Sequence, residues 1–241
     1  MTMIYVMEEN MNIAIILAGG TGSRLGGDIP KQYIEVDGKP IISYCLERFE
    51  HHQFVDSIVI VAAEEWQRFI EDWIRIVKIS KFGGFAPSGS SRQHSILNGM
   101  IKAKENGAQK EDSIIIHDAA RPNISHEIIS QCFKQLNDFD GVMPVLPVND
   151  TIYLSSNGKN ISSLLNRDQL FAGQAPESFN FGKYFDIHSG MSEKELAVIR
   201  GSSEVAYRYG LNIRMIPGDE HNYKITTAQD LSKFIREMKE N

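Results

Sequence analysis

The sequence has few cysteines and no long apolar run. Only Cys45 and Cys132 occur among 241 residues, which excludes a disulfide framework and a cysteine-rich zinc site. Both lie in apolar, helix-like segments, so we expect buried free thiols and a reducing, cytoplasmic setting. No stretch approaches the roughly 20 apolar residues that span a bilayer. The first apolar run, 13–18, is short and follows Glu8 and Glu9 instead of a basic segment, so we expect no secretory signal.

An excess of positive charge is also missing. The chain has 25 Lys and Arg against 31 Asp and Glu, a formal net charge of −6, which argues against a protein that mainly coats nucleic acid or a membrane. A local basic site for a phosphorylated substrate stays open. The seven histidines include no pair with zinc-protease spacing. A content of 42% hydrophobic and 23% charged residues is typical of an ordinary globular enzyme.

Apolar segments alternate with amphipathic ones along most of the chain. Continuous apolar runs at 12–17, 57–62 and 113–117 predict strands that are buried on both faces, as in a parallel sheet. Further strands are expected at 141–148, 151–154 and 212–216, and helices at 40–49, 64–77, 90–104, 125–136, 202–209 and 227–239, with another beginning at 179. Strands separated by helices indicate βαβ units.

This pattern predicts an α/β fold with a single three-layer, Rossmann-like domain over residues 12–241 and a mostly parallel sheet. Residues 141–176 break the alternation, because they contain prolines and glycines and no good helix. We expect them to form a β-rich arm inserted in the domain. Residues 1–11 are typical of a leader, a tag remnant or an alternative start.

A glycine-rich turn follows the first expected strand, within 17–31. Glycines at the carboxyl end of a strand let the backbone approach a phosphate closely. The turn is not a P-loop, since no Gly-Lys pair is followed by Ser or Thr, and Gly26 comes one residue too late for a dinucleotide loop. Arg24 and Lys31 suit a polyphosphate whose charge grows as pyrophosphate leaves. A plain glycine turn with solvated charges is the alternative.

The segment Ala-Gly-Gly-Thr-Gly-Ser-Arg at 18–24, with Pro-Lys-Gln-Tyr at 30–33, resembles the signature of the polyol-phosphate cytidylyltransferases. Matching segments follow in order at 91–99, 117–122, 147–151, 174–179 and 222–227. The likeness runs from about residue 12 to 240. Two branches share these motifs: one acts on 2-C-methyl-D-erythritol 4-phosphate in isoprenoid synthesis, and the other on ribitol 5-phosphate in wall and capsule synthesis.

The resemblance implies a nucleotidyltransferase domain that binds CTP. The residues expected to contact CTP are Ala18, Gly19, Gly20, Gly22, Ser23, Arg92, Ser95 and Asp118. Asp118 ends the third strand and faces the glycine turn, where a hard oxygen suits Mg²⁺ bridged to phosphates. We therefore expect Asp118 to bind Mg²⁺, with a turn cap as the alternative. We expect the neighbouring His117 to be packed and not a zinc ligand.

The resemblance also implies four catalytic cations and an acceptor site. Arg24 and Lys31 would stabilise the α-phosphate and the leaving pyrophosphate, and Lys224 would orient the α-phosphate. Arg167 and Thr151 on the arm would grip the phosphate of the polyol, together with Arg121. In the family such an arm crosses to a partner subunit, so we expect a homodimer through 141–176.

Three departures from the family pattern keep other functions open. The run 88–91 lacks the usual acidic residue, which leaves room for another base or sugar phosphate. Ala175 replaces a threonine expected near the polyol phosphate, and 200–203 differs from the usual sequence. A catalytically silent nucleotide-binding protein is the third reading.

Overall fold

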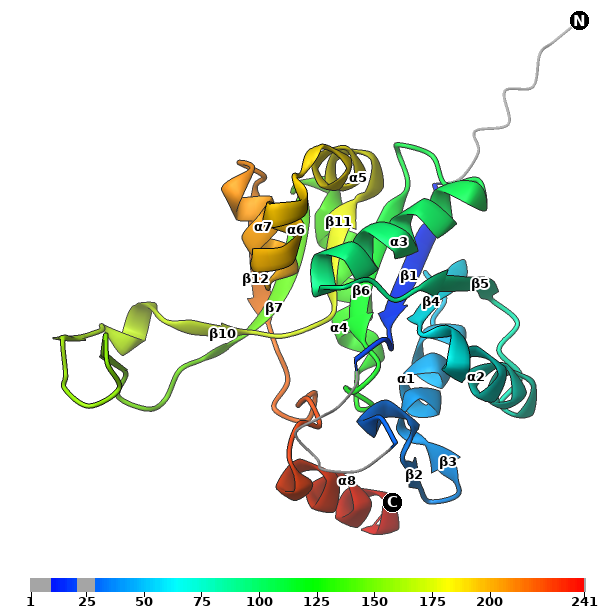
Figure 1. The fold of residues 1–241 in the computed structure, drawn as a ribbon, viewed down its shortest axis with the longest axis horizontal. Helices are drawn as coiled ribbons and strands as arrows, with labels where there is room; N and C mark the ends of the chain where they lie inside the picture. The colour runs from blue at the N-terminus through cyan, green and yellow to red at the C-terminus, as the bar shows by residue number, and fades with distance from the viewer. Residues whose placement is uncertain (1–9, 21–28, 241) are drawn as a thin grey trace, which may run out of the picture.

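The computed structural model describes residues 10–20 and 29–240 (Figure 1). Three of the predicted site residues, Gly22, Ser23 and Arg24, lie outside the described residues, as does most of the segment 1–11. Of that segment, Met11 is already joined to the domain, because its N–H donates to Asp112 Oδ1 at 2.8 Å. Its carbonyl oxygen accepts from the N–H of Ser113 at 2.9 Å.

A single sheet lies at the centre of the described part of the chain. Its eight strands there are β1 (Asn12–Leu17), β4 (Ser57–Ala62), β5 (Phe82–Pro87), β6 (Ser113–Asp118), β7 (Gly141–Pro147), β10 (Phe171–Gly173), β11 (Glu177–Asn180) and β12 (Ile213–Pro217). The order is β10-β7-β11-β6-β1-β4-β5, with β12 beside β7. Strands β6, β1, β4 and β5 are parallel, as are β7 and β12, whereas β11 and β10 pair antiparallel with their neighbours. The prediction of a mostly parallel sheet is confirmed.

Helices cover both faces of this sheet and give the three predicted layers (Figure 1). On one face lie α3 (Arg92–Glu105), α5 (Phe181–Gly190), α6 (Glu193–Val198) and α7 (Ser202–Arg208). On the other lie α1 (Ile41–Glu50), α2 (Glu64–Ile76) and α4 (His126–Lys134). In β1, Ala14 and Ile16 face the second set, while Ile13 and Ile15 face the first. This double burial explains why the strand is apolar at every position.

Smaller elements complete the fold. Helix α8 (Ala228–Glu240) packs its buried Phe234 near β2 (Glu35–Val36) and β3 (Lys39–Pro40). Its first turn is capped as expected, since Thr227 Oγ1 accepts from the N–H of Asp230 at 3.2 Å. Short 3-10 helices cover Lys31–Tyr33, Gln135–Asn137 and Arg167–Gln169. No helix in the described ranges combines the length and apolar character that crossing a membrane requires.

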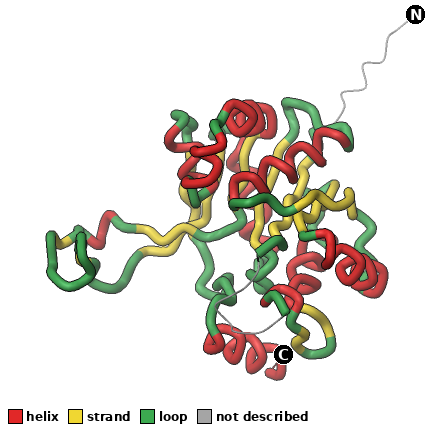
Figure 2. The backbone as a smooth tube through the Cα atoms, in the orientation of Figure 1, coloured by secondary structure: helices red, strands yellow, loops and turns green. Residues whose placement is uncertain are grey.

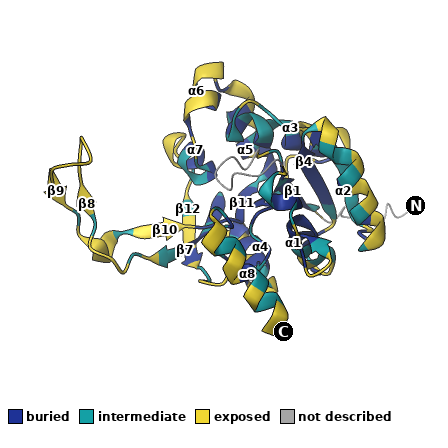
Figure 3. Ribbon diagram, turned by 60° about the horizontal axis from the view of Figure 1, so that its bottom comes forward, coloured by how far each residue is buried: buried dark blue, intermediate teal, exposed yellow. Residues whose placement is uncertain are grey.

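The projecting arm is shorter than the expected 141–176. Strands β7 and β10 belong to the main sheet, and 148–170 leave it as a long excursion with the small hairpin β8 (Tyr153–Leu154) and β9 (Ser163–Leu164) (Figure 2). Figure 3 shows this hairpin in the colour of exposed residues, in contrast to the buried β1 and β4. Large apolar side chains are exposed on the arm, at Tyr153, Leu154, Ile161 and Leu164, and at Phe171 in the adjoining β10.

Candidate active site

A cavity of about 510 Å³ opens at the carboxyl edge of β1 and β6. The predicted site residues that line it are Gly19, Gly20, Lys31, Arg92, Ser95, Asp118 and Lys224. They come from four parts of the chain, which the parallel strands and their following loops bring to one edge of the sheet. Ala18 is buried directly behind the lining, at 1% exposure.

Two side chains of the Lys31–Tyr33 helix stabilise the start of the glycine turn through hydrogen bonds to its backbone. Gln32 Nε2 donates to the carbonyl oxygens of Ala18 and Gly20 at 2.5 and 2.8 Å, and the Tyr33 hydroxyl donates to Ala18 at 2.9 Å. A Cβ at Gly19 would lie 2.5 Å from Ser88 Cβ, so the close approach there requires glycine. Gln32 belongs to the recognised motif, yet its bracing role was not foreseen, because a buried amide gives no periodic signal.

The N-terminus of α3 forms the opposite wall. Ser91 caps the helix by accepting from the N–H of His94 at 3.2 Å. Ser95 Oγ accepts from the N–H of Gly89 at 3.0 Å and donates to the Ser91 carbonyl oxygen at 3.0 Å. Ser95 therefore fixes the loop before the helix and faces the cavity at the same time.

Asp118 lies at the centre of a cluster of three cations. Arg92 Nη1 pairs with Oδ1, Lys224 Nζ lies 2.9 Å from Oδ2, and Arg121 Nε lies 3.5 Å from Oδ2. Burial alone would raise the pKa of Asp118, but the charges of these three side chains outweigh it and hold the pKa well below its usual range. The carboxylate is therefore ionised at neutral pH. Three cations around one carboxylate leave an excess of positive charge for a phosphorylated ligand.

His117 next to Asp118 is a packed residue, as expected. Its ring is fully buried, and Nε2 lies 2.9 Å from the carbonyl oxygen of Arg121. Burial lowers its pKa to about 4, so the ring is neutral. The neutral ring therefore stabilises the turn that carries Arg121 and adds no charge to the site.

A second cavity, of about 700 Å³, meets the first at Arg92 and Asp118, which line both. Arg121 lines only the second cavity, together with Gln174, Glu177, Ser203 and Glu204. Met143, Ala175, Ile213 and Met215 form an apolar part of its wall. Two ligands can therefore occupy adjacent spaces on either side of the Arg92–Asp118 ion pair.

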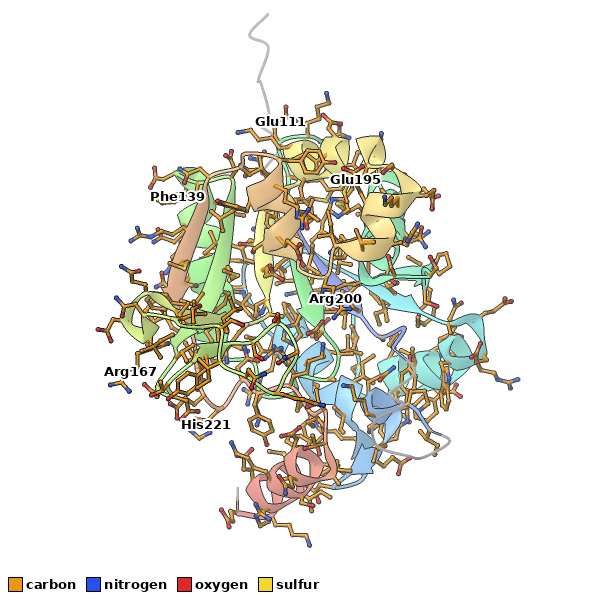
Figure 4. All side chains as sticks on the ribbon, turned by 60° about the vertical axis from the view of Figure 1, so that its left-hand side comes forward. Glu111, Phe139, Arg167, Glu195, Arg200 and His221 are labelled. Carbon is orange, nitrogen blue, oxygen red and sulfur yellow. The ribbon has the colours of Figure 1, made fainter. Side chains whose placement is uncertain are left out.

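The predicted arm residues do not reach either cavity within one chain. Thr151 and Arg167 are exposed, and Arg167 Nη1 donates to the carbonyl oxygen of Asn149 at 3.0 Å. Figure 4 shows Arg167 on the arm, apart from Arg200, which precedes α7. Neither residue lines either of the two cavities.

Metal binding at this edge would depend on one carboxylate. In the described ranges, no three His, Cys, Asp or Glu side chains gather in a group that could hold a metal ion. Mg²⁺ commonly takes only one or two protein carboxylates and completes its shell with water and substrate phosphates. The ionised Asp118 fits that pattern.

A glycine turn and an aspartate surrounded by cations, at the carboxyl edge of a Rossmann-like sheet with a second cavity adjoining, are the arrangement that a nucleotidyltransferase needs. The family model of 2-C-methyl-D-erythritol 4-phosphate cytidylyltransferase matches residues 12–237. The chain therefore belongs to the 2-C-methyl-D-erythritol 4-phosphate cytidylyltransferase family and is a cytidylyltransferase. The resemblance found in the sequence motifs is confirmed.

Individual relatives agree with this family. The 2-C-methyl-D-erythritol 4-phosphate cytidylyltransferase of Clostridium tetani is 35% identical over 237 residues, covering 97% of this chain and 94% of the relative. A crystal structure of a 4-diphosphocytidyl-2C-methyl-D-erythritol synthase superposes with a TM-score of 0.79 at 26% identity, over 95% of this chain and 99% of that one. The corresponding synthase of Anaerococcus prevotii gives a TM-score of 0.79 at 20% identity, over 96% and 97% of the two chains, and supports the fold.

Proposed function

We propose that this enzyme transfers a cytidylyl group from CTP to 2-C-methyl-D-erythritol 4-phosphate, forming the CDP-polyol and diphosphate. The structural observation that supports this proposal most strongly is a cluster of cations around Asp118 at the junction of two cavities. Its members are Arg92, Arg121 and Lys224. One cavity would take the nucleotide and the other the acceptor. The reacting phosphates would then meet where positive charge is concentrated.

The nucleotide would lie in the 510 Å³ cavity. Ala18, Gly19 and Gly20 would present backbone to its phosphates, and Ser95 and Arg92 would face the nucleoside. Gly22, Ser23 and Arg24, outside the described residues, would complete this site. Lys31, with Arg24, would stabilise the α-phosphate and the departing diphosphate, and Lys224 would orient the α-phosphate for attack.

The acceptor would lie in the second cavity with its phosphate directed to the cations. A phosphate monoester has a second pKa of about 6, so it is largely ionised at neutral pH and needs no general base to attack the α-phosphorus in line. Arg121 lines this cavity and would hold the acceptor. The apolar wall at Met143, Ile213 and Met215 supports an acceptor with a methyl branch over an unbranched alditol.

We infer a homodimer in which the arm of each subunit serves the acceptor site of the other. The exposed apolar side chains of the arm support this arrangement, because their burial against a second copy would be favourable in water. Thr151 and Arg167 would reach the acceptor's phosphate from the second copy. Arg suits bidentate phosphate contacts.

Mg²⁺ is the cation we assign to the site, with Asp118 as its protein ligand. When bound, it would neutralise negative charge on the triphosphate. The two buried free thiols, Cys45 and Cys132, support a cytoplasmic setting.

A panel of acceptors tests the proposal. We expect diphosphate release from CTP and Mg²⁺ to depend on 2-C-methyl-D-erythritol 4-phosphate, and to be far slower with ribitol 5-phosphate. ATP, GTP and UTP in place of CTP test the base. Faster release with ribitol 5-phosphate, or with another nucleotide, would contradict the assigned substrates. Binding of CTP without any release would indicate a silent nucleotide-binding protein.

A further inference from the structure

Glu177 is a buried carboxylate in the wall of the second cavity for which the reaction described above gives no role. It begins β11 and is 7% exposed. It lies on the same face of the strand as Phe179, whose ring stacks on Tyr184 of α5 at a centroid distance of 4.0 Å. The backbone that carries Glu177 is therefore fixed by the core of the domain.

One oxygen of this carboxylate is anchored and the other is not. Oε2 accepts hydrogen bonds from the N–H and the Oγ of Ser203, at 2.7 and 2.5 Å. Oε1 lies 3.8 Å from Arg92 Nη2, beyond hydrogen-bond distance. In the described ranges no side chain or backbone group donates a hydrogen bond to Oε1. Two bonds from Ser203 thus hold the side chain in place and leave an acceptor oxygen at the cavity wall.

The other carboxylates of this cavity are neutralised at closer range. Asp118 contacts Arg92, Arg121 and Lys224, and Glu204 pairs with Arg208 at 2.8 Å. The negative charge of Glu177 therefore has the weakest compensation in the cavity. A buried carboxylate can only accept hydrogen bonds, so it favours hydroxyl groups and disfavours anions beside it.

We propose that Glu177 selects the uncharged polyol chain of the acceptor. Oε1 accepts a hydrogen bond from an acceptor hydroxyl, and the charge of the carboxylate excludes compounds that carry a second anionic group in addition to the phosphate. The phosphate is thereby directed away from Glu177 and toward the cations. This inference rests on the proposed function, because it takes the second cavity as the site of the acceptor.

Two four-carbon competitors test the inference. D-erythritol 4-phosphate and D-erythronate 4-phosphate differ only in a terminal CH₂OH or carboxylate, and their inhibition constants are measured against 2-C-methyl-D-erythritol 4-phosphate. We expect the native enzyme to bind the erythritol compound more tightly. The ratio to compare is the inhibition constant of the erythronate compound divided by that of the erythritol compound. In Glu177→Gln this ratio should fall on the order of tenfold, since the charge that repels the second anion is gone. Glu177→Asp keeps the charge and should keep most of the ratio.

Ser203→Ala is the matched control. It removes one of the two anchoring bonds and leaves the carboxylate, so both constants can change together while their ratio stays that of the native enzyme. An unchanged ratio in Glu177→Gln would overturn the inference, as would an equal fall in Ser203→Ala. A native enzyme that is inhibited equally by both compounds, or by neither, would also overturn it. Absence of any CDP-polyol from the native enzyme is a separate result, which contradicts the proposed function instead.

Discussion

Asp118 is the residue on which the charges of the site converge. Its side chain is 10% exposed, and three cationic side chains contact it or lie within 3.5 Å. Removing one partner from a buried ion pair leaves uncompensated charge, which commonly costs about 3–5 kcal/mol. These ion pairs therefore hold three separate segments of the chain together. They also concentrate positive charge where a phosphate could bind.

We predict that Asp118→Asn destabilises the fold by about 3 kcal/mol at neutral pH and weakens Mg²⁺ binding in the presence of CTP. The pKa of Asp118 is lower in the folded chain than its value of about 3.9 in the unfolded chain. Its ion pairs therefore stabilise the fold above about pH 4, and this gain is lost as the pH falls through the folded pKa. Urea unfolding of the native chain and of Asp118→Asn between neutral and acidic pH measures the difference between their free energies of unfolding. A difference in the free energy of unfolding that grows as the pH falls would show that the ionised Asp118 does not stabilise the fold.

The sequence motifs predicted the residues of the charged cluster but not the neighbouring Glu177. Arg92, Asp118, Arg121 and Lys224 come together in the structure because each follows a strand or begins a helix at the same edge of the sheet. Their catalytic and binding roles stay predictions. Glu177 belongs to a recognised segment, yet its burial and its anchoring by Ser203 depend on tertiary packing, and no local pattern encodes them.

At the scale of elements, most helices and buried strands were predicted, whereas strands β5 and β11 were not. The expected helix 64–77 is α2, and the buried runs 12–17 and 57–62 are β1 and β4. Strand β5 was missed, because its Phe-Gly-Gly-Phe start has neither alternation nor β-branched residues. β11 occupies the start of the helix expected at 179, which begins instead at Phe181. Its four residues pair between β6 and β7, and a long-range pairing of that kind leaves little local signal.

Two glycines in helices of one face give a paired test of the packing. In α3, a Cβ at Gly99 would lie 2.6 Å from Ile15 Cγ2 and 3.0 Å from Val61 Cγ2, whereas a Cβ at Gly190 in α5 meets nothing within 4 Å. We expect Gly99→Ala to lower stability by about 1–2 kcal/mol through overpacking, despite its better helix propensity. Gly190→Ala should be neutral or raise stability by up to about 1 kcal/mol. Thermal unfolding of both variants is the measurement, and a stabilised Gly99→Ala would show that α3 is not packed against β1 as described.

At the scale of the whole molecule, we propose that residues of two chains complete the acceptor site. Lys224 lines the nucleotide cavity of its own chain, whereas Arg167 lies on the exposed arm. We expect Lys224→Ala and Arg167→Ala each to reduce turnover on the order of 10²–10³, by analogy with the loss of a single transition-state donor.

Mixing the two inactive variants tests the sharing directly. A mixed dimer contains one site with both Lys224 and the arm's Arg167, so activity should reappear after subunit exchange, with the sedimentation coefficient of a dimer. Two copies of the same variant provide the control. Failure of the mixture to regain activity, although mixed dimers form, would contradict the sharing of sites.

Transfer of label from [α-³²P]CTP tests the central claim most directly. With Mg²⁺ and 2-C-methyl-D-erythritol 4-phosphate, the account predicts that the label appears in the CDP-polyol and that one unlabelled diphosphate is released for each label transferred. Label that stays in CTP, or that appears as free CMP while the acceptor is unchanged, would contradict it.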